Sequence, residues 1–245
     1  MCTLTLVAGD TIHYIAMNRD ERITRGAGKP PEMHECRGTK AIYPSDGEDG
    51  AWIGANEYGI VLALLNWNDV VSPGDRNGKA RSRGQVIPAL IGSRSLAELS
   101  MAFKASNVKG MLPFRLVGIF PFEKQIWEWR WNRTQLESQV HMWESRHWFS
   151  SSLSDQQAEV LRGAACRDAH SEPDAGSVPW LRRLHASHAG GPGPFSVCVH
   201  REDVRTLSYT EVALAPMTLA VEHFLGSPCS MGSSRLVEIQ RAANT

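Results

Sequence analysis

The chain has 245 residues, and its 26 basic side chains are balanced by 26 acidic ones. This balance excludes a global field that would recruit nucleic acid or an anionic membrane, so no nucleic-acid partner is expected. The length suits one domain over residues 1–245, large enough to bury about two-thirds to three-quarters of its unfolded surface.

The five cysteines include no Cys-x-x-Cys pair, which argues against a disulfide framework. No window approaches the ~20 apolar residues that span a bilayer, and no signal-peptide pattern opens the chain. We therefore expect a cytoplasmic protein without an integral membrane segment; its oligomeric state is left open.

A hairpin is predicted at the start of the chain. Thr3 to Ala8 and Thr11 to Met17 have strand character, and Gly9-Asp10 between them is a turn signal. A tight turn would set Cys2 opposite Met17. Because such registers slip, the prediction is only that residues 17–20 end near the N-terminus.

Cys2 is the candidate nucleophile. Removal of Met1 would leave an α-amine beside the Cys2 thiol, and an amine with a pKa of about 8 can accept the thiol proton. Asp20 would then hydrogen-bond that amine. The alternative is that Cys2 is a small buried residue of a strand and that Asn18-Arg19-Asp20-Glu21 is a solvated loop.

The next hundred residues alternate between loops, strands and helices. Thr24 to Pro44 is rich in glycine, proline and charge, which predicts a surface loop lying over a site. Strands are expected at Ala51 to Asn56 and Gly59 to Asn66, followed by a loop over 69–83. Helices are expected at Gly84 to Gly92, despite Pro88, and from a Ser95 cap to Ala105.

The middle third returns to strand periodicity, in Phe114 to Phe120, Gln125 to Trp131 and Leu136 to Trp143. Alternation places Trp127, Trp129 and Trp131 on one face. That face is interpreted as a core surface under helices, with an aromatic wall for an apolar ligand as the alternative.

The last third is predicted to begin with helices and end mainly with strands. The expected helices run from a Ser154 cap to Arg167, from Val178 to Ser187, and from Leu236 to Ala243. Strands are expected at Phe195 to His200 and Arg205 to Tyr209. Strands, two helical blocks and strands again are what an α+β fold with two sheets between helical layers would produce, and other α+β folds share this order.

Several short motifs resemble one family. Met-Cys-Thr-Leu at the start and Asn18-Arg19-Asp20-Glu21 are similar to the NRDE family, the transport and Golgi organisation protein 2 homologues. Gly50-Ala51-Trp52-Ile53-Gly54, Leu64-Leu65-Asn66 and Ser82-Arg83-Gly84 extend the resemblance. That family is similar to N-terminal nucleophile hydrolases of the penicillin V acylase and bile salt hydrolase type. The resemblance implies a four-layer αββα fold and amide hydrolysis.

The resemblance also implies roles for particular residues. Cys2 matches the nucleophile, Asp20 the carboxylate beside it, and Asn66 an asparagine that helps form an oxyanion hole. Arg19 corresponds to an arginine of the acylases only if the backbone turns differently, because Met17 stands at the position three residues before the aspartate. Ser151 stands where a second asparagine is usual. Asn18 and Trp67 are the candidate substrate-binding residues.

The sequence departs from the family near its C-terminal strands. Gly191-Pro192-Gly193-Pro194 replaces a Gly-Thr-Arg element, which removes a cation that would anchor a substrate carboxylate. His34 with Cys36 and Cys198 with His200 come nearest to a metal pattern, but their spacing matches no known ligand set. No metal and no cofactor are assigned.

Two functions remain open. One is a hydrolase that cleaves a non-peptide amide or a related acyl bond through a Cys2 thioester, with a small-molecule substrate. The other is a non-catalytic protein that binds and carries an apolar ligand, such as a lipid, acyl-CoA or haem. The altered second asparagine and the missing arginine favour the second function.

Overall fold

The computed structural model describes residues 2–70, 80–230 and 232–242. Within them, the chain forms two antiparallel sheets. Sheet A has the order β10 (Arg146–Ser150), β1 (Cys2–Val7), β2 (His13–Arg22), β11 (Val204–Leu214), β12 (Thr218–Leu225) and β13 (Ser234–Gln240). Sheet B has the order β3 (Lys29–Cys36), β4 (Thr39–Ser45), β5 (Ile53–Asn56), β6 (Val61–Asn66), β7 (Phe114–Phe120), β8 (Gln125–Trp131) and β9 (Leu136–His141).

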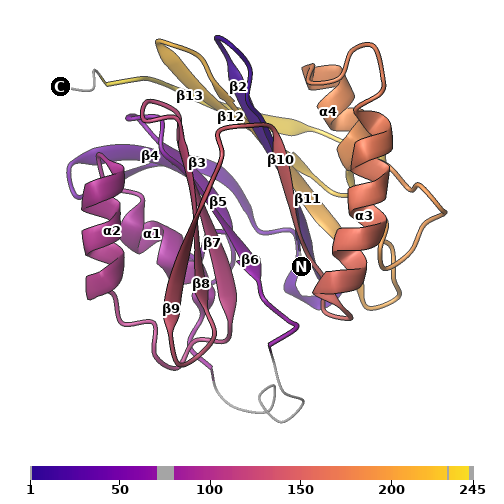
Figure 1. The fold of residues 1–245 in the computed structure, drawn as a ribbon, viewed down its shortest axis with the longest axis horizontal. Coiled ribbons are helices and arrows are strands. Elements are labelled where there is room, and N and C mark those ends of the chain that lie inside the picture. The colour runs from indigo at the N-terminus through magenta and orange to yellow at the C-terminus, as the bar shows by residue number, and fades with distance from the viewer. Residues whose placement is uncertain (1, 71–79, 231, 243–245) are drawn as a thin grey trace.

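The two sheets pack face to face, and helices cover their outer faces (Figure 1). The interlayer core joins residues of both sheets, among them Leu4, Met17, Ile53 and Val117. On sheet B lie α1 (Val86–Leu90) and α2 (Leu96–Ala105), and on sheet A lie α3 (Asp155–Ala169) and α4 (Val178–His185). The predicted four-layer αββα architecture is confirmed. None of the helices in the described residues is long and apolar enough to cross a membrane.

The opening hairpin is present with a different register. A longer connection, residues 8–12, joins β1 to β2, so Cys2 pairs with Arg19 and not with Met17. The shift is by two residues, which leaves every side chain on its predicted face. Residues 17–20 end beside Cys2, as the pattern predicted.

The prediction of a surface loop from Thr24 to Pro44 is wrong. This segment forms the hairpin β3–β4 at the edge of sheet B. Arg37 and Gly38 both have positive φ, 52° and 75°, which closes a tight hairpin turn. Pro30 and Pro31 lie at a register shift of the edge strand β3. Their missing N–H groups therefore remove no hydrogen bond between the strands. Of the expected loop over 69–83, residues 71–79 lie outside the described residues.

The tryptophan face is a core surface under helices. Trp127 and Trp129 stack with ring centroids 5.8 Å apart, and Trp129 meets Phe103 of α2 edge-on. Strands β5 to β9 and helices α1 to α4 follow the predicted order. Ser95 and Ser154 cap α2 and α3 by accepting hydrogen bonds from the N–H groups of Glu98 and Gln157.

Two further predictions near the C-terminus are wrong. Residues 195–200 are irregular and do not form the expected strand. The carbonyl of Val197 accepts a hydrogen bond from Nδ2 of Asn18, and the N–H of Cys198 donates to the Ser187 carbonyl. Of the helix expected from Leu236 to Ala243, residue 243 lies outside the described residues and the rest is not helical; it overlaps β13, in which Val237 and Ile239 face the interlayer core. Strands β10 and β12 had no sequence prediction.

Candidate active site

Cys2 lies at the start of β1, between two neighbouring strands. Its backbone pairs with Arg19 of β2 on one side and Ser150 of β10 on the other. The side chain is 5% exposed and faces the interlayer side, like Leu4 and Leu6 two and four residues on. Burial raises the pKa of the Cys2 thiol, which favours its protonated form.

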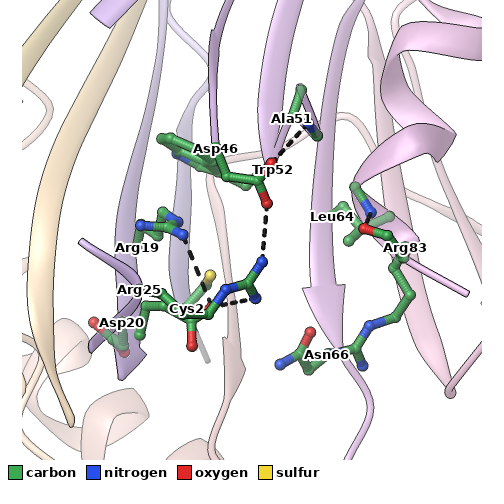
Figure 2. A pocket seen from close by; sticks show the side chains of 14 residues that line it. Cys2, Arg19, Asp20, Arg25, Asp46, Ala51, Trp52, Leu64, Asn66 and Arg83 are labelled. Carbon is green, nitrogen blue, oxygen red and sulfur yellow. Dashed lines mark hydrogen bonds and ion pairs between the residues drawn. The ribbon is translucent and has the colours of Figure 1, made fainter. Parts of the chain in front are cut away.

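The exposed part of Cys2 borders a cavity of ≈ 120 Å³ between the two sheets. Side chains of both sheets face one another across it (Figure 2). The wall on the sheet A side includes Cys2, Arg19, Asp20 and Glu21, and the other side is made by Arg25, Asp46, Gly50, Ala51, Trp52, Leu64, Asn66, Ser82, Arg83 and Gly84. Most of this lining is charged or polar.

Asp20 lies beside the N-terminal end of β1 and is almost fully buried. Its Oδ1 accepts a hydrogen bond from the Thr206 hydroxyl at 2.7 Å, and its Oδ2 lies 3.3 Å from Nη1 of Arg162. Burial raises the pKa of Asp20, and the guanidinium of Arg162 opposes the shift.

Arg162 contacts Asp20 and the start of β1, which the sequence did not reveal. It projects from α3 and is fully buried. Nη1 donates to the Cys2 carbonyl at 3.3 Å and to the Thr3 hydroxyl at 2.9 Å, and Nη2 donates to the Pro194 carbonyl at 3.3 Å. The single guanidinium thus ties the first strand, Asp20 and the loop before β11 together.

Arg19 lies directly opposite Cys2 and reaches the same cavity with β2 in regular strand geometry. The guanidinium lies 4.5 Å from the centre of the Trp52 ring and donates to the Gly26 carbonyl at 2.8 Å. Burial lowers its pKa, though an arginine stays charged at neutral pH.

Glu21 continues the face of Cys2 and Arg19, and the sequence analysis had assigned it no role. Arg25 bridges Glu21 at 3.1 Å and Asp46 at 3.0 Å. Because side chains alternate along a strand, a cavity position for Arg19 would have predicted one for Glu21 as well. The cavity positions of Asp46 and Arg25 could be found only from the tertiary structure.

Asn66 and Arg83 form the opposing wall. Asn66 is the last residue of β6, and Figure 2 shows it beside Arg83 across the cavity from Cys2. Nη1 of Arg83 donates to the Pro113 carbonyl at 3.0 Å, and burial lowers the pKa of the Arg83 guanidinium. Arg83 lies in the Ser-Arg-Gly element, whose role the sequence had left unassigned.

A second cavity of ≈ 360 Å³ adjoins the first and shares Asp20, Glu21, Asn66 and Arg83 with it. Its remaining lining is mixed: Arg22, Asn68, Leu112, Ser152, Leu153, Arg201, Asp203 and Val204. The two spaces together have room for a ligand with a polar end and an apolar portion.

Three candidate residues lie away from the Cys2 cavity. Asn18 faces α4, where its Nδ2 donates to the carbonyls of His185 and Val197. Ser151 accepts the Leu153 N–H in the turn before α3. Trp67 borders a separate space next to Arg130. The structure therefore brings Cys2, Arg19, Asp20 and Asn66 together and leaves these three out.

The fold is that of the N-terminal nucleophile hydrolases. The structure is similar to penicillin V acylase from Agrobacterium tumefaciens, with 13% identity, a TM-score of 0.53 and coverage of 98% of this chain and 86% of that one. It is also similar to the C2A mutant of conjugated bile acid hydrolase from Clostridium perfringens, with 11% identity, a TM-score of 0.52 and coverage of 100% and 97%.

The chain belongs to the Transport and Golgi organisation 2 family (TANGO2), whose model matches residues 1–168. No curated protein matches the sequence. The matched residues include both walls of the Cys2 cavity and Arg162 behind it.

Proposed function

We propose that this protein is a cysteine hydrolase of the N-terminal nucleophile type, acting on a non-peptide amide or a related acyl bond. The position of Cys2 carries the proposal. Its thiol borders a polar cavity, with Asp20 beside the start of its strand and Asn66 on the opposing wall. These are the parts that acyl transfer to a thiol requires.

The buried Cys2 thiol needs a base, because burial favours its protonated form. In the proposed mechanism, removal of Met1 exposes the Cys2 α-amine, and Asp20 orients that amine. The amine takes the thiol proton as Sγ attacks the carbonyl carbon, and the leaving amine receives the proton as the C–N bond breaks. Water then attacks the thioester, releasing the acid and restoring the thiol.

Asn66 would donate to the oxyanion that forms on the carbonyl oxygen. One such donor contributes roughly 3 to 4 kcal/mol of transition-state stabilisation. Arg19 and Arg83 give the cavity two guanidinium groups: Arg19 lies 3.9 Å from a carboxylate oxygen of Glu21, and Arg83 donates to the Pro113 carbonyl. A substrate with a carboxylate or another anionic group suits these cations. Its apolar portion would lie against Leu112, Leu153 and Val204.

A non-catalytic carrier of lipid, acyl-CoA or haem is the competing proposal. The apolar side chains of the larger cavity favour it, and the charged lining around Cys2 disfavours it. The two proposals differ in turnover, since a carrier binds its ligand stoichiometrically and does not consume it.

The first test is the intact mass of the purified protein before and after an acyl electrophile. We expect wild type to have lost Met1 and to gain one acyl group more than Cys2→Ala, since Cys229 is exposed in both proteins. Cys166→Ala is the matched control, because Cys166 lies on the buried face of α3 and its loss should leave labelling unchanged.

The second test is hydrolysis of an amide panel that includes penicillin V and conjugated bile acids. Turnover should fall roughly 10³-fold or more in Cys2→Ala and in a form that keeps a residue ahead of Cys2. Turnover that survives both changes would contradict the mechanism. Stoichiometric binding of lipid, acyl-CoA or haem, without turnover on any amide, would support the carrier.

A further inference from the structure

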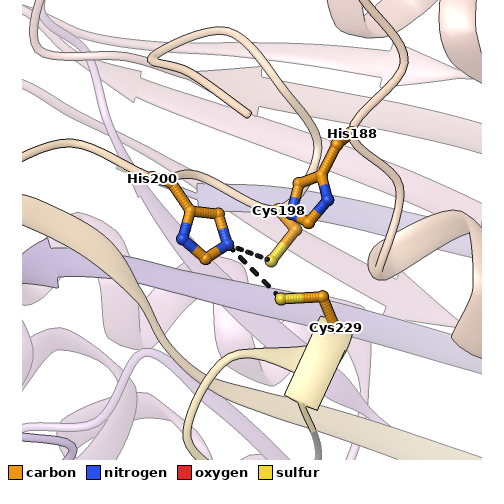
Figure 3. Close-up of side chains that lie close together, drawn as sticks. All are labelled: His188, Cys198, His200 and Cys229. Atoms are coloured by element: carbon orange, nitrogen blue, oxygen red, sulfur yellow. Dashed lines mark hydrogen bonds between the residues drawn. The ribbon is translucent and has the colours of Figure 1, made fainter. Parts of the chain in front are cut away.

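Four side chains with metal-binding atoms converge at a place distinct from the Cys2 cavity. They are His188, Cys198, His200 and Cys229, and their ligand atoms all lie within 4.8 Å of one another (Figure 3). Cys198 and His200 lie in the irregular segment before β11, His188 in the loop after α4, and Cys229 in the short helix Pro228–Ser230 after β12.

The distances match the edges of a tetrahedral zinc site. Nε2 of His200 lies 3.5 Å from Sγ of Cys198 and 3.3 Å from Sγ of Cys229. With Zn–S of about 2.3 Å and Zn–N of about 2.0–2.1 Å, tetrahedral geometry requires S···N separations of roughly 3.5 Å. His200 already has that separation from both sulfurs, and the rings of His188 and His200 have centroids 4.8 Å apart.

A second observation points to a missing ligand. Nε2 of His188 is buried, yet it has no hydrogen-bond partner among the described residues. Buried polar atoms are normally paired, so an orphaned imidazole nitrogen beside two thiols and a second imidazole needs an explanation. A bound cation would supply the missing partner.

We infer that His188, Cys198, His200 and Cys229 form a Zn²⁺ site. Two sulfur and two nitrogen donors in a tetrahedral arrangement are the ligand set of structural zinc, whereas magnesium and calcium prefer oxygen. Binding releases one proton from each thiol, and the two thiolates neutralise the charge of the ion. Four protein ligands leave no open position, so the ion has a structural role.

The site is accessible to a metal ion from solvent. Cys198 is fully buried, whereas His188 and His200 are half-buried and Cys229 is exposed. An ion can therefore enter from the Cys229 side and meet the buried sulfur last.

Zinc here would hold the loop behind Asp20. The N–H of Val199, between two ligands, donates to the Thr206 hydroxyl at 2.8 Å, and that hydroxyl donates to Asp20 at 2.7 Å. The ion would link this segment to the loop after α4 and to the end of β12. It would thus brace a wall of the candidate active site without touching the substrate.

The test measures zinc on the full chain, purified under reducing conditions and titrated against a chromogenic chelator. We expect about one equivalent of Zn²⁺ per chain for wild type. Cys229→Ser and His200→Asn should each lower the affinity roughly 100-fold. Cys36→Ser is the matched control, because Cys36 is a partly exposed cysteine of sheet B. Cobalt substitution gives a second readout: tetrahedral absorption with thiolate charge transfer, lost in Cys229→Ser.

The inference fails if reduced wild type binds no zinc at micromolar metal, or if Cys229→Ser binds it as tightly as wild type. It also fails if peptide mapping finds Cys198 joined to Cys229 and the reduced protein takes up no metal, since the two thiols would then be a disulfide pair. Cys229 is exposed, so its serine variant should fold, and circular dichroism checks this. The readout is metal content, so it is independent of whether Cys2 has hydrolytic activity.

Discussion

At the scale of single residues, alternation along β2 decides which side chains serve the cavity. Arg19 and Glu21 share the face of Cys2, whereas Asn18 faces α4. Asp20 also faces the helix side but reaches the N-terminal end of β1, where a Cys2 α-amine would lie. Of the four residues Asn18 to Glu21, two therefore face the cavity and two face the helices that cover sheet A.

Arg83 predicts a preference for anionic electrophiles, because the other two arginines of the cavity, Arg19 and Arg25, form ion pairs with carboxylates of its lining. Replacing Arg83 by Gln should lower the ratio of iodoacetate to iodoacetamide labelling rates at Cys2 roughly 3- to 10-fold, because one positive charge near the sulfur attracts the anion alone. Labelling rates by mass spectrometry measure this ratio. Arg235→Gln removes the same charge from an exposed position on β13 and should leave it unchanged. An equal effect of both variants would contradict a local role for Arg83.

The buried pair of Arg162 and Asp20 predicts a stability effect. Arg162→Met should lower the free energy of unfolding by roughly 3 to 5 kcal/mol, because it removes the guanidinium that faces the buried Asp20 carboxylate. Adding Asp20→Asn should restore part of the loss. Urea denaturation of the two single variants and the double variant measures the coupling. If the three variants are simply additive, the pair does not carry the effect.

At the scale of elements, turn chemistry separates the correct predictions from the wrong ones. Ser95 and Ser154 mark helix starts by a local hydrogen bond, and both helices are present. The β3–β4 hairpin was missed because Pro30 and Pro31 read as loop residues and because the strands alternate weakly. Their pairing depends on β5, a neighbour outside the segment.

That hairpin turn predicts a clean backbone effect. Gly38 has φ of 75° with no atom near an added Cβ, so Gly38→Ala should cost about 1 kcal/mol through backbone strain alone. Gly47 has the same open surroundings without a positive φ, and Gly47→Ala should change stability by less than about 0.5 kcal/mol or raise it. Thermal and urea unfolding compare the two. Equal costs would mean that the turn conformation is not the cause.

At the scale of the whole molecule, the cavity exists because two sheets meet. Cys2, Arg19 and Glu21 come from sheet A, and Asn66 at the end of β6 faces them from sheet B. Helix α3 then supplies Arg162 from behind sheet A.

Buried histidines predict that the fold loses stability in acid. Burial lowers the pKa of His185 to about 3 and those of His147 and His223 to about 4. Each stays neutral in the folded state while its unfolded counterpart gains a proton below pH 6.5. Stability is therefore complete above that pH and is lost as pH falls towards 4.

For His185 alone the loss at pH 4 is roughly 3 kcal/mol. Urea unfolding between pH 7 and 4 measures it. A His185→Gln variant should show a smaller pH-dependent loss by about that amount, whatever its stability at pH 7. If the free energy of unfolding of His185→Gln depends on pH as steeply as that of wild type, protonation of His185 on unfolding is not the cause of the loss.

The sequence by itself determined the αββα class, the helices that begin with serine caps, and the pairing of Cys2 with the segment that holds Asp20. The serine caps and the hairpin are local signals, whereas the αββα class rested on the family resemblance together with the order of the elements. The tertiary structure alone decided that Arg25, Asp46 and Arg83 line the cavity, that Arg162 holds Asp20, and that His188 and Cys229 approach Cys198 and His200. Those groups are far apart in the chain or assigned no role by it, and their side chains meet because sheets and helices pack as layers.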